Sequence, residues 1–191
     1  MGKYRRLFAD AKSRIFSWGT VWGTMLIRKT REEEIGELLG LYAAARRFMA
    51  ENGNPTQWGA ARPSDGTVAQ DVRAGESYVC EQGGRIAAAF AFRLGDDPTY
   101  AEIWDGAWPD DGPYGVVHRL VSAGVARGAA AFCLDWAFAQ CGSLRIDTHE
   151  NNAPMRALLQ KCGFSPCGRI FASDGTERLA FYKAAGPIRS K

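Results

Sequence analysis

The chain has 191 residues and a formal net charge of +3, with 46% hydrophobic and 24% charged residues. This length and composition are those of one globular domain with a sizeable core, and no apolar run is long enough to span a bilayer, which excludes a membrane segment. The basic excess is concentrated in residues 1–24 and the remainder is close to neutral, which argues against a nucleic-acid-binding face.

These observations divide the chain into three parts. We interpret residues 1–24 as an extension outside the fold, residues 25–183 as the folded domain and residues 184–191 as a loose tail. The five cysteines form no Cys-x-x-Cys pair and no pattern with histidine that would bind a metal; they are Cys80, Cys133, Cys141, Cys162 and Cys167. Free thiols, no metal and a cytoplasmic location are therefore expected.

The domain is predicted to begin with a strand followed by a helix. The strand covers residues 25–30, and Thr30 is a suitable N-cap for a helix whose apolar stripe runs over residues 35–49. The loop at residues 54–59 contains Pro, Gly and the unusual loop residue Trp58. Trp58 either contacts an acceptor molecule or caps the core.

A second helix and a hairpin follow. The helix is predicted over residues 67–74, and the sequence Gln82-Gly83-Gly84 joins two strands at residues 77–81 and 85–93. Both faces of the second strand are apolar, which is typical of a central strand covered by helices on both sides.

The next segment, residues 95–112, combines six acidic residues with three large aromatic residues. Such a rim, which includes Glu102 and Trp104, suits a cationic amine through charge attraction and cation–π contact. A solvated loop around a short strand explains the same composition.

The remaining elements form a strand, a crossover helix, a strand, another helix and two closing strands. The strands are expected at residues 114–121, 144–148, 165–172 and 178–183. The crossover helix is expected at residues 126–140, and the other helix ends at residues 161–164. Alternation in the first of these strands places Val116, His118 and Leu120 on one face.

The crossover helix begins after a turn of small residues that contains Gly124 and Gly128. Free N–H groups and the helix dipole at such a start favour a phosphate, and Arg127 adds a positive charge. Tight packing of two elements also uses small residues, so the turn alone does not decide between these readings.

Two motifs in this region resemble the GCN5-related N-acetyltransferase (GNAT) superfamily. The pyrophosphate loop of that family reads Gln/Arg-x-x-Gly-x-Gly/Ala, and Gly128 and Ala130 match its last two positions, whereas Val125 replaces the first. A second family motif, Asn followed by Tyr-Glu-Lys-x-Gly-Phe, is matched by Asn152, Lys161, Gly163 and Phe164.

The tyrosine position of the second motif is Leu159. In many members this tyrosine protonates the departing CoA thiolate, so this chain must use another donor or water. The resemblance extends over about residues 25 to 183, and it implies a single-domain α/β fold. The expected sheet is mixed and mostly antiparallel, with about six or seven strands flanked by about four helices.

The resemblance also implies which residues bind acetyl-CoA as the co-substrate. They lie on the strand end, the glycine loop and the last helix: Leu120, Val121, Ser122, Val125, Ala126, Arg127, Gly128, Ala129, Ala130 and Asn152. Main-chain N–H groups around Val121 and Ser122 are expected to polarise the thioester carbonyl.

Acetyl transfer needs a base for the amine, and histidine is the side chain whose ordinary pKa suits this task. His118 lies in the strand before the glycine loop, and His149 ends the following strand. Each also has a structural interpretation, His118 as a core histidine and His149 as a residue that orients the next turn. Tyr182 and Glu102 are further candidates.

The resemblance therefore implies an N-acetyltransferase that moves an acetyl group from acetyl-CoA directly to a primary amine, and we expect the amine to belong to a small molecule rather than a protein. Trp58, Glu102 and Trp104 are the expected substrate contacts, and the protein is expected to be a monomer or homodimer. An acyl-CoA-binding sensor without catalysis is the alternative, favoured by Leu159 and Val125. A redox-active thiol protein would need two adjacent cysteines, which the spacing does not indicate.

Overall fold

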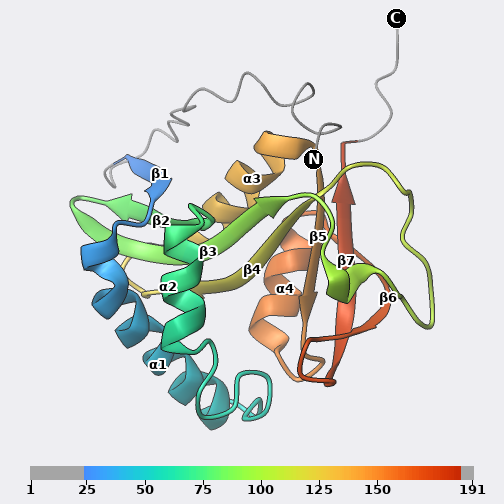
Figure 1. Ribbon diagram of the computed structural model, residues 1–191, viewed down its shortest axis with the longest axis horizontal. Helices are drawn as coiled ribbons and strands as arrows, with labels where there is room; N and C mark the ends of the chain where they lie inside the picture. Colours follow the sequence, from blue (N-terminus) through green and yellow to red (C-terminus); the bar gives the residue numbers. More distant parts are fainter. Residues whose placement is uncertain (1–23, 186–191) are drawn as a thin grey trace, which may run out of the picture.

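The computed structural model of the chain describes residues 24–185, in which a mixed sheet is flanked by helices on both faces (Figure 1). The strands are β1 (Met25–Lys29), β2 (Ser77–Gln82), β3 (Arg85–Leu94), β4 (Gly115–Ser122), β5 (Ser143–Thr148), β6 (Ser165–Phe171) and β7 (Glu177–Ala184). The helices are α1 (Ile35–Glu51), α2 (Asp65–Arg73), α3 (Ala129–Cys141) and α4 (Ala153–Lys161), with 3-10 turns η1 (Glu32–Glu34) and η2 (Pro98–Tyr100). The predictions for residues 1–23 and 186–191 lie outside the described residues.

The strand order is β1-β2-β3-β4-β5-β7-β6, and the described part of the chain forms seven strands and four α-helices. Neighbouring strands are antiparallel except β4 and β5, which are parallel because α3 crosses over between them. Helices α1 and α2 cover one face, and α3 and α4 cover the other (Figure 1). The predicted fold class is confirmed.

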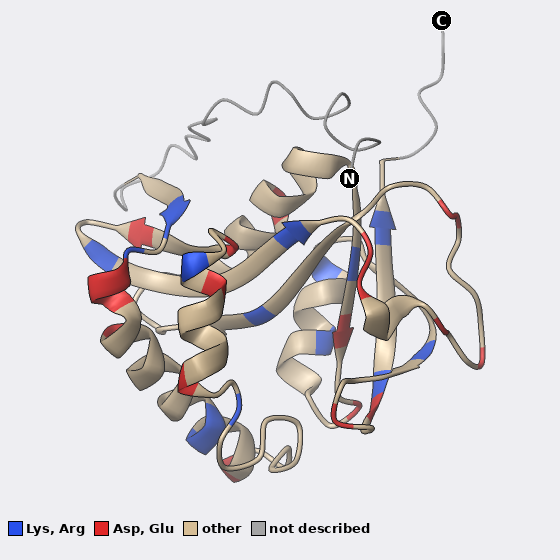
Figure 2. Cartoon of the chain, viewed as in Figure 1, with Lys and Arg blue, Asp and Glu red and all other residues tan. Residues whose placement is uncertain are grey.

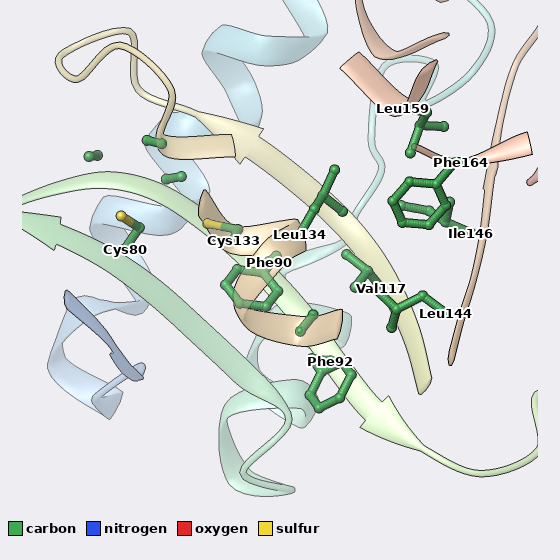
Figure 3. Packing of buried hydrophobic residues seen from close by; sticks show 14 of the residues in the cluster. Cys80, Phe90, Phe92, Val117, Cys133, Leu134, Leu144, Ile146, Leu159 and Phe164 are labelled. Atoms are coloured by element: carbon green, nitrogen blue, oxygen red, sulfur yellow. The ribbon is translucent and has the colours of Figure 1, made fainter. Parts of the chain in front are cut away.

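The largest core cluster fills the space between the sheet and helices α3 and α4 (Figure 3). Leu134 of α3 is fully buried there, and Ile146, Leu159 and Phe164 lie together at one end of the cluster. Burial of a leucine side chain of this kind contributes about 1.5–3 kcal/mol. The apolar residues of β3 pack on both faces, as expected for a central strand.

Two helix starts differ from the sequence prediction. Thr30 is not an N-cap, because its hydroxyl lies 2.7 Å from Oγ of Ser77 and η1 intervenes before α1. Helix α2 begins at Asp65 rather than Thr67, since Oγ of Ser64 accepts a hydrogen bond from the Thr67 backbone N–H at 3.2 Å.

Helix α3 begins at Ala129, three residues later than the expected residue 126. Gly128 precedes it in the left-handed region with φ of 85°, a conformation that fits glycine and ends the preceding turn. The expected turn and helix are thus present, with the helix boundary set by the backbone of this glycine.

The expected alternation along β4 is wrong beyond His118. Arg119 adopts φ of 56°, and the pairing of β3 with β4 shifts between Ala89 and Ala91, which together form a β-bulge. As a result, Val116 packs in the cluster with Tyr100, whereas Leu120 packs against the cluster under α3 and α4. The bulge therefore moves Leu120 to the opposite face from Val116.

In residues 24–185, no helix is both long and apolar enough to cross a membrane. The same residues contain no group of three or more His, Cys, Asp or Glu side chains positioned to hold a metal ion.

Candidate active site

The site is built on a split in the sheet between β4 and β5. The two strands pair at Gly115 with Leu144 and at Val116 with Arg145, and within the described residues no further pair joins them. Beyond this point β4 follows β3 and β5 follows β7, so the two strands diverge (Figure 1). A cleft of about 1330 Å³ lies here, lined by β4, β5, α1, α2, α4 and the start of α3.

His118 lies on β4 in this cleft with its side chain 24% exposed. Its Nε2 is 2.7 Å from Oδ2 of Asp97, and its Nδ1 is 3.9 Å from Oδ1 of Asp147. Burial opposes ionisation of Asp97, but hydrogen bonds from His118 and Thr99 outweigh it and hold the pKa of this carboxyl well below its usual value. An ionised carboxylate can only accept, so Nε2 donates to Asp97, and in the neutral ring Nδ1 is the nitrogen that can accept a proton.

Asp147 is held on the other side of the imidazole. The hydroxyl of Tyr100 donates to Oδ1 of Asp147 at 2.8 Å, and Nε of Arg178 lies 3.9 Å from Oδ2. Tyr100 is buried, and burial followed by the charge of Asp147 raises its pKa well above the usual value, so the phenol stays protonated. The Asp147 carboxylate is therefore fixed in place facing Nδ1 of His118.

The bulged residue Arg119 carries a second polar group into the cleft. Its Nη2 donates to Oδ1 of Asp71 on α2 at 2.8 Å. Burial raises the pKa of Asp71, although the charge of Arg119 opposes this shift. The cleft wall on the α2 side is thus an ion pair rather than an acidic surface.

The start of α3 forms another end of the cleft, where Ser122, Gly124 and Ala130 are lining residues. A Cβ added at Gly128 would have no neighbour within 4 Å, so the approach to the backbone is open. No acidic residue occupies the first turn of α3, and Arg127 is exposed beside it. Free N–H groups, positive dipole and open access suit the pyrophosphate of CoA.

The loop between α1 and α2 closes the side of the cleft opposite α3. The ring of Trp58 packs edge-on against that of Tyr42, with 5.7 Å between the ring centroids, so Trp58 caps the core, and it also lines the cleft. Asn152 caps α4 through a hydrogen bond from the Met155 backbone N–H at 3.1 Å. Its amide also donates to Oε1 of Gln57 at 2.9 Å, which connects this cap to the loop.

Several other predicted residues lie away from the cleft. His149 is half-buried in the turn after β5, where its Nδ1 accepts from the Asn151 backbone N–H at 3.1 Å. Glu102 and Trp104 line a separate shallow pocket with Phe171. Tyr182 bonds to Asp110 and to Ser143.

The acidic segment 95–112 does not form a rim over the cleft. It contains η2 and a single bridge between Trp104 and Arg169 in place of a short strand, and its acidic residues spread along the outer side near β6 and β7 (Figure 2). Asp97, Pro98 and Thr99 are the residues of this segment that line the cleft, and Asp97 is the acidic one among them.

Sequence reasoning missed the roles of Asp97, Asp147, Arg119 and Gln57. A signal existed for Asp147, which is a half-buried charged residue inside β5 (Ser143–Thr148), a strand that also contains the buried Arg145. The ordinary expectation that a buried charge is paired could have directed attention to it.

The size of the cleft is compatible with acetyl-CoA. Its volume exceeds the range of about 300–1,000 Å³ typical of small-ligand pockets, as a long ligand requires. Leu159, at the tyrosine position of the family motif, is 0% exposed and packs in the core, so it presents nothing to a sulfur atom.

The class of protein is an α/β protein whose mixed sheet splits around a large cleft, with a crossover helix that starts at the opening and an imidazole on the strand beside it. The model of the acetyltransferase (GNAT) family matches residues 46–164, and the chain belongs to this family.

Solved structures share the fold of this chain. A GNAT-family acetyltransferase from Streptococcus agalactiae is 28% identical, with a TM-score of 0.78 over 88% of this chain and 99% of that chain. Naa50 of Arabidopsis thaliana in complex with the bisubstrate analogue CoA-Ac-MVNAL is 16% identical, with a TM-score of 0.54 over 84% of this chain and 99% of that one. AAC(6')-Ib in complex with ribostamycin and coenzyme A is 16% identical, with a TM-score of 0.58 over 87% and 98% of the two chains. A search of the curated proteins finds no match by sequence.

Proposed function

We propose that the protein is an N-acetyltransferase that transfers the acetyl group of acetyl-CoA directly to a primary amine. The observation that carries this proposal is the placement of His118 on the strand that borders the opening, with its Nδ1 left to accept a proton. Family membership supports the use of acetyl-CoA. The strand end and glycine loop, from Leu120 to Ala130, together with Asn152, are the proposed contacts of the co-substrate.

In this mechanism the neutral amine attacks the thioester carbonyl while Nδ1 of His118 takes up its proton. The N–C bond forms, the C–S bond breaks, and the sulfur leaves as a thiolate. Oδ2 of Asp97 accepts a hydrogen bond from the Nε2–H of His118, and its negative charge stabilises the imidazolium that results. Main-chain N–H groups near Val121 and Ser122 stabilise negative charge on the carbonyl oxygen.

We propose that the acceptor is a small molecule. In support, the loop after α1 is tied across the cleft, because Gln57 bonds Asn152 and Arg62 forms an ion pair with Asp174 in the turn before β7. Asp147 offers a carboxylate to the incoming ammonium or amine group. Trp58 contacts the acceptor in this proposal, whereas Glu102 and Trp104 would have to act from the neighbouring pocket.

A second candidate function is an acyl-CoA sensor that performs no transfer. The burial of Leu159 favours it, because the usual proton donor to the thiolate is missing, and Val125 removes one side-chain contact to the pyrophosphate. A cytoplasmic location and a monomeric or homodimeric state are part of both proposals.

The test is the melting temperature of the full chain with and without acetyl-CoA. A ligand that binds the folded state raises its stability by about 2.7 kcal/mol at a concentration of 100 Kd. Gly128→Glu should abolish this rise by placing a carboxylate at the phosphate site. Gly128→Ala is the matched control, because it carries the same backbone penalty at φ of 85° without adding charge.

Turnover then separates the enzyme from the sensor. The wild type would be incubated with acetyl-CoA and a panel of small amines, both cationic and neutral, with free thiol release as the measurement. Release that depends on the amine supports the enzyme. A rise in melting temperature without any release supports the sensor, and no rise at millimolar acetyl-CoA removes both.

A further inference from the structure

The proposed reaction needs a partner for the departing sulfur that α4 does not supply. The residues of α4 and its cap that line the cleft are Asn152, Pro154, Met155 and Leu158. Three of them are apolar, and the amide of Asn152 is already used by the Met155 backbone N–H and by Gln57. Another hydrogen-bond donor must therefore reach the sulfur if the protein assists its departure.

Thr148 is such a donor. It is the last residue of β5, beyond the point where β4 and β5 separate, and it lines the cleft. Thr148 is 0% exposed, and its Oγ1 has no hydrogen-bond partner; among residues 24–185 it is the one buried hydroxyl in this condition. An unsatisfied buried hydroxyl destabilises the fold, and a ligand that accepts its hydrogen bond would remove this penalty.

The position of Thr148 complements that of the base. Along β5, Leu144 and Ile146 point to the face covered by α3 and α4. Because side chains alternate along a strand, Thr148 points to the same face. Asp147 points to the opposite face, where it meets His118. A thioester held in the opening between the strands would thus have the base on one face and the Thr148 hydroxyl on the other.

We propose that the hydroxyl of Thr148 donates a hydrogen bond to the sulfur as the C–S bond breaks, in place of the tyrosine absent at Leu159. This inference rests on the proposed function. Thr148 keeps its proton, the thiolate leaves with this hydrogen bond, and the proton from the amine stays on His118 until solvent removes it. Hydrogen bonds to charged groups contribute enough to change a rate by about 10- to 100-fold.

The test compares the full-length wild type with Thr148→Val, which keeps the shape, and Thr148→Ser, which keeps the hydroxyl. The probes are CoA and desulfo-CoA, which lacks the sulfur, titrated at pH 7 and above pH 9, where a free thiol is ionised. We expect Thr148→Val to weaken binding of CoA at the higher pH by about 10-fold or more, leave desulfo-CoA unaffected and lower kcat, and Thr148→Ser to restore both.

Three outcomes are distinguishable. If the wild type binds neither probe, the proposed function itself fails. If it binds both and Thr148→Val leaves their affinity ratio unchanged at high pH, this inference fails while the function stands. If Thr148→Val lowers the melting temperature of the free protein and leaves the ratio unchanged, the hydroxyl has a structural partner such as a buried water, and the inference is again overturned.

Discussion

The side-chain amide of Asn152 donates a hydrogen bond of 2.9 Å to Oε1 of Gln57, which lies 95 positions earlier in the chain. The same oxygen accepts from Nδ2 of Asn54 at 2.8 Å, and the main-chain carbonyl of Gln57 accepts from Nη2 of Arg178 at 3.0 Å. One glutamine thereby connects the loop after α1 to the N-cap of α4 and to β7. Two of these three hydrogen bonds therefore hold the loop to other elements at the cleft wall, and the third lies within the loop.

Two variants of Asn152 separate its role as the N-cap of α4 from its hydrogen bond to Gln57. Asn152→Ala removes both and should lower the stability by about 1–2 kcal/mol, as loss of an N-cap does. Asn152→Asp keeps the acceptor for the Met155 backbone N–H but faces Oε1 of Gln57 with a carboxylate. We expect Asn152→Asp to retain most of the stability and to increase protease cleavage in the loop, measured by limited proteolysis. Equal cleavage of both variants and wild type would show that the loop does not depend on this bond.

The two histidines are predicted to differ in activity. His118→Asn should lower kcat/KM by about 10²- to 10⁴-fold, the usual contribution of a general base, and remove the acid limb of the pH–rate profile. His149→Asn is the matched control, since this ring lies in a turn and burial followed by the charge of Arg178 lowers its pKa. A larger loss in His149→Asn than in His118→Asn would reverse the assignment. Melting temperatures of both variants control for misfolding.

Restoring the family tyrosine at position 159 should not restore a proton donor. Leu159 is 0% exposed among Ile146 and Phe164, so Leu159→Tyr overpacks the core and should cost about 1–3 kcal/mol. Leu159→Phe introduces a similar ring without the hydroxyl. Turnover faster in the tyrosine variant than in the phenylalanine variant would mean that the hydroxyl reaches the sulfur after all.

Acid stability tests the ion pair that precedes α1. The carboxylate of Glu34 accepts from Arg28 at 2.8 and 2.7 Å, and these hydrogen bonds, with those from Arg31, outweigh burial and lower its pKa from 4.5 to about 2. A lowered carboxyl pKa stabilises the fold fully above pH 4.5, and this contribution is lost as the pH falls towards 2. Glu34→Gln should therefore cost about 2–3 kcal/mol at pH 7 in urea unfolding, with the difference from wild type shrinking below pH 4.5.

Glu33 provides the control for this experiment. Its side chain is 71% exposed and lies 3.4 Å from Arg31, so Glu33→Gln should change stability by less than about 1 kcal/mol at any pH. A pH-independent difference between Glu34→Gln and wild type would assign the effect to packing instead of charge.

Local patterns predicted most of the fold, and the departures have backbone causes. Apolar periodicity located the helices and strands, because each buries one face or both. The bulge at Arg119 was not predictable from composition, since arginine in the left-handed region has no sequence signal comparable to glycine. It is this bulge that reverses the direction of Leu120 and brings Arg119 to Asp71.

The site was predictable where its signal is local. The glycine loop, His118 and Asn152 stand in recognisable positions along the chain, and all of them border the cleft or the start of α3. Asp97 was counted with an acidic segment, but its contacts with His118 and Thr99 depend on how the loop after β3 folds back. Gln57 acts across a long sequence separation, which no local pattern records.

The short junction between β4 and β5 has a consequence for the lifetime of the protein. Two residue pairs join these strands within residues 24–185, whereas five or six pairs join each of the other neighbouring strands. We therefore expect local opening at this line to cost less free energy than elsewhere in the sheet. A ligand that fills the opening binds only the closed form and shifts this equilibrium in proportion to its concentration. If acetyl-CoA is that ligand, its supply in the cell sets how long each molecule survives proteolysis as well as how fast it turns over substrate.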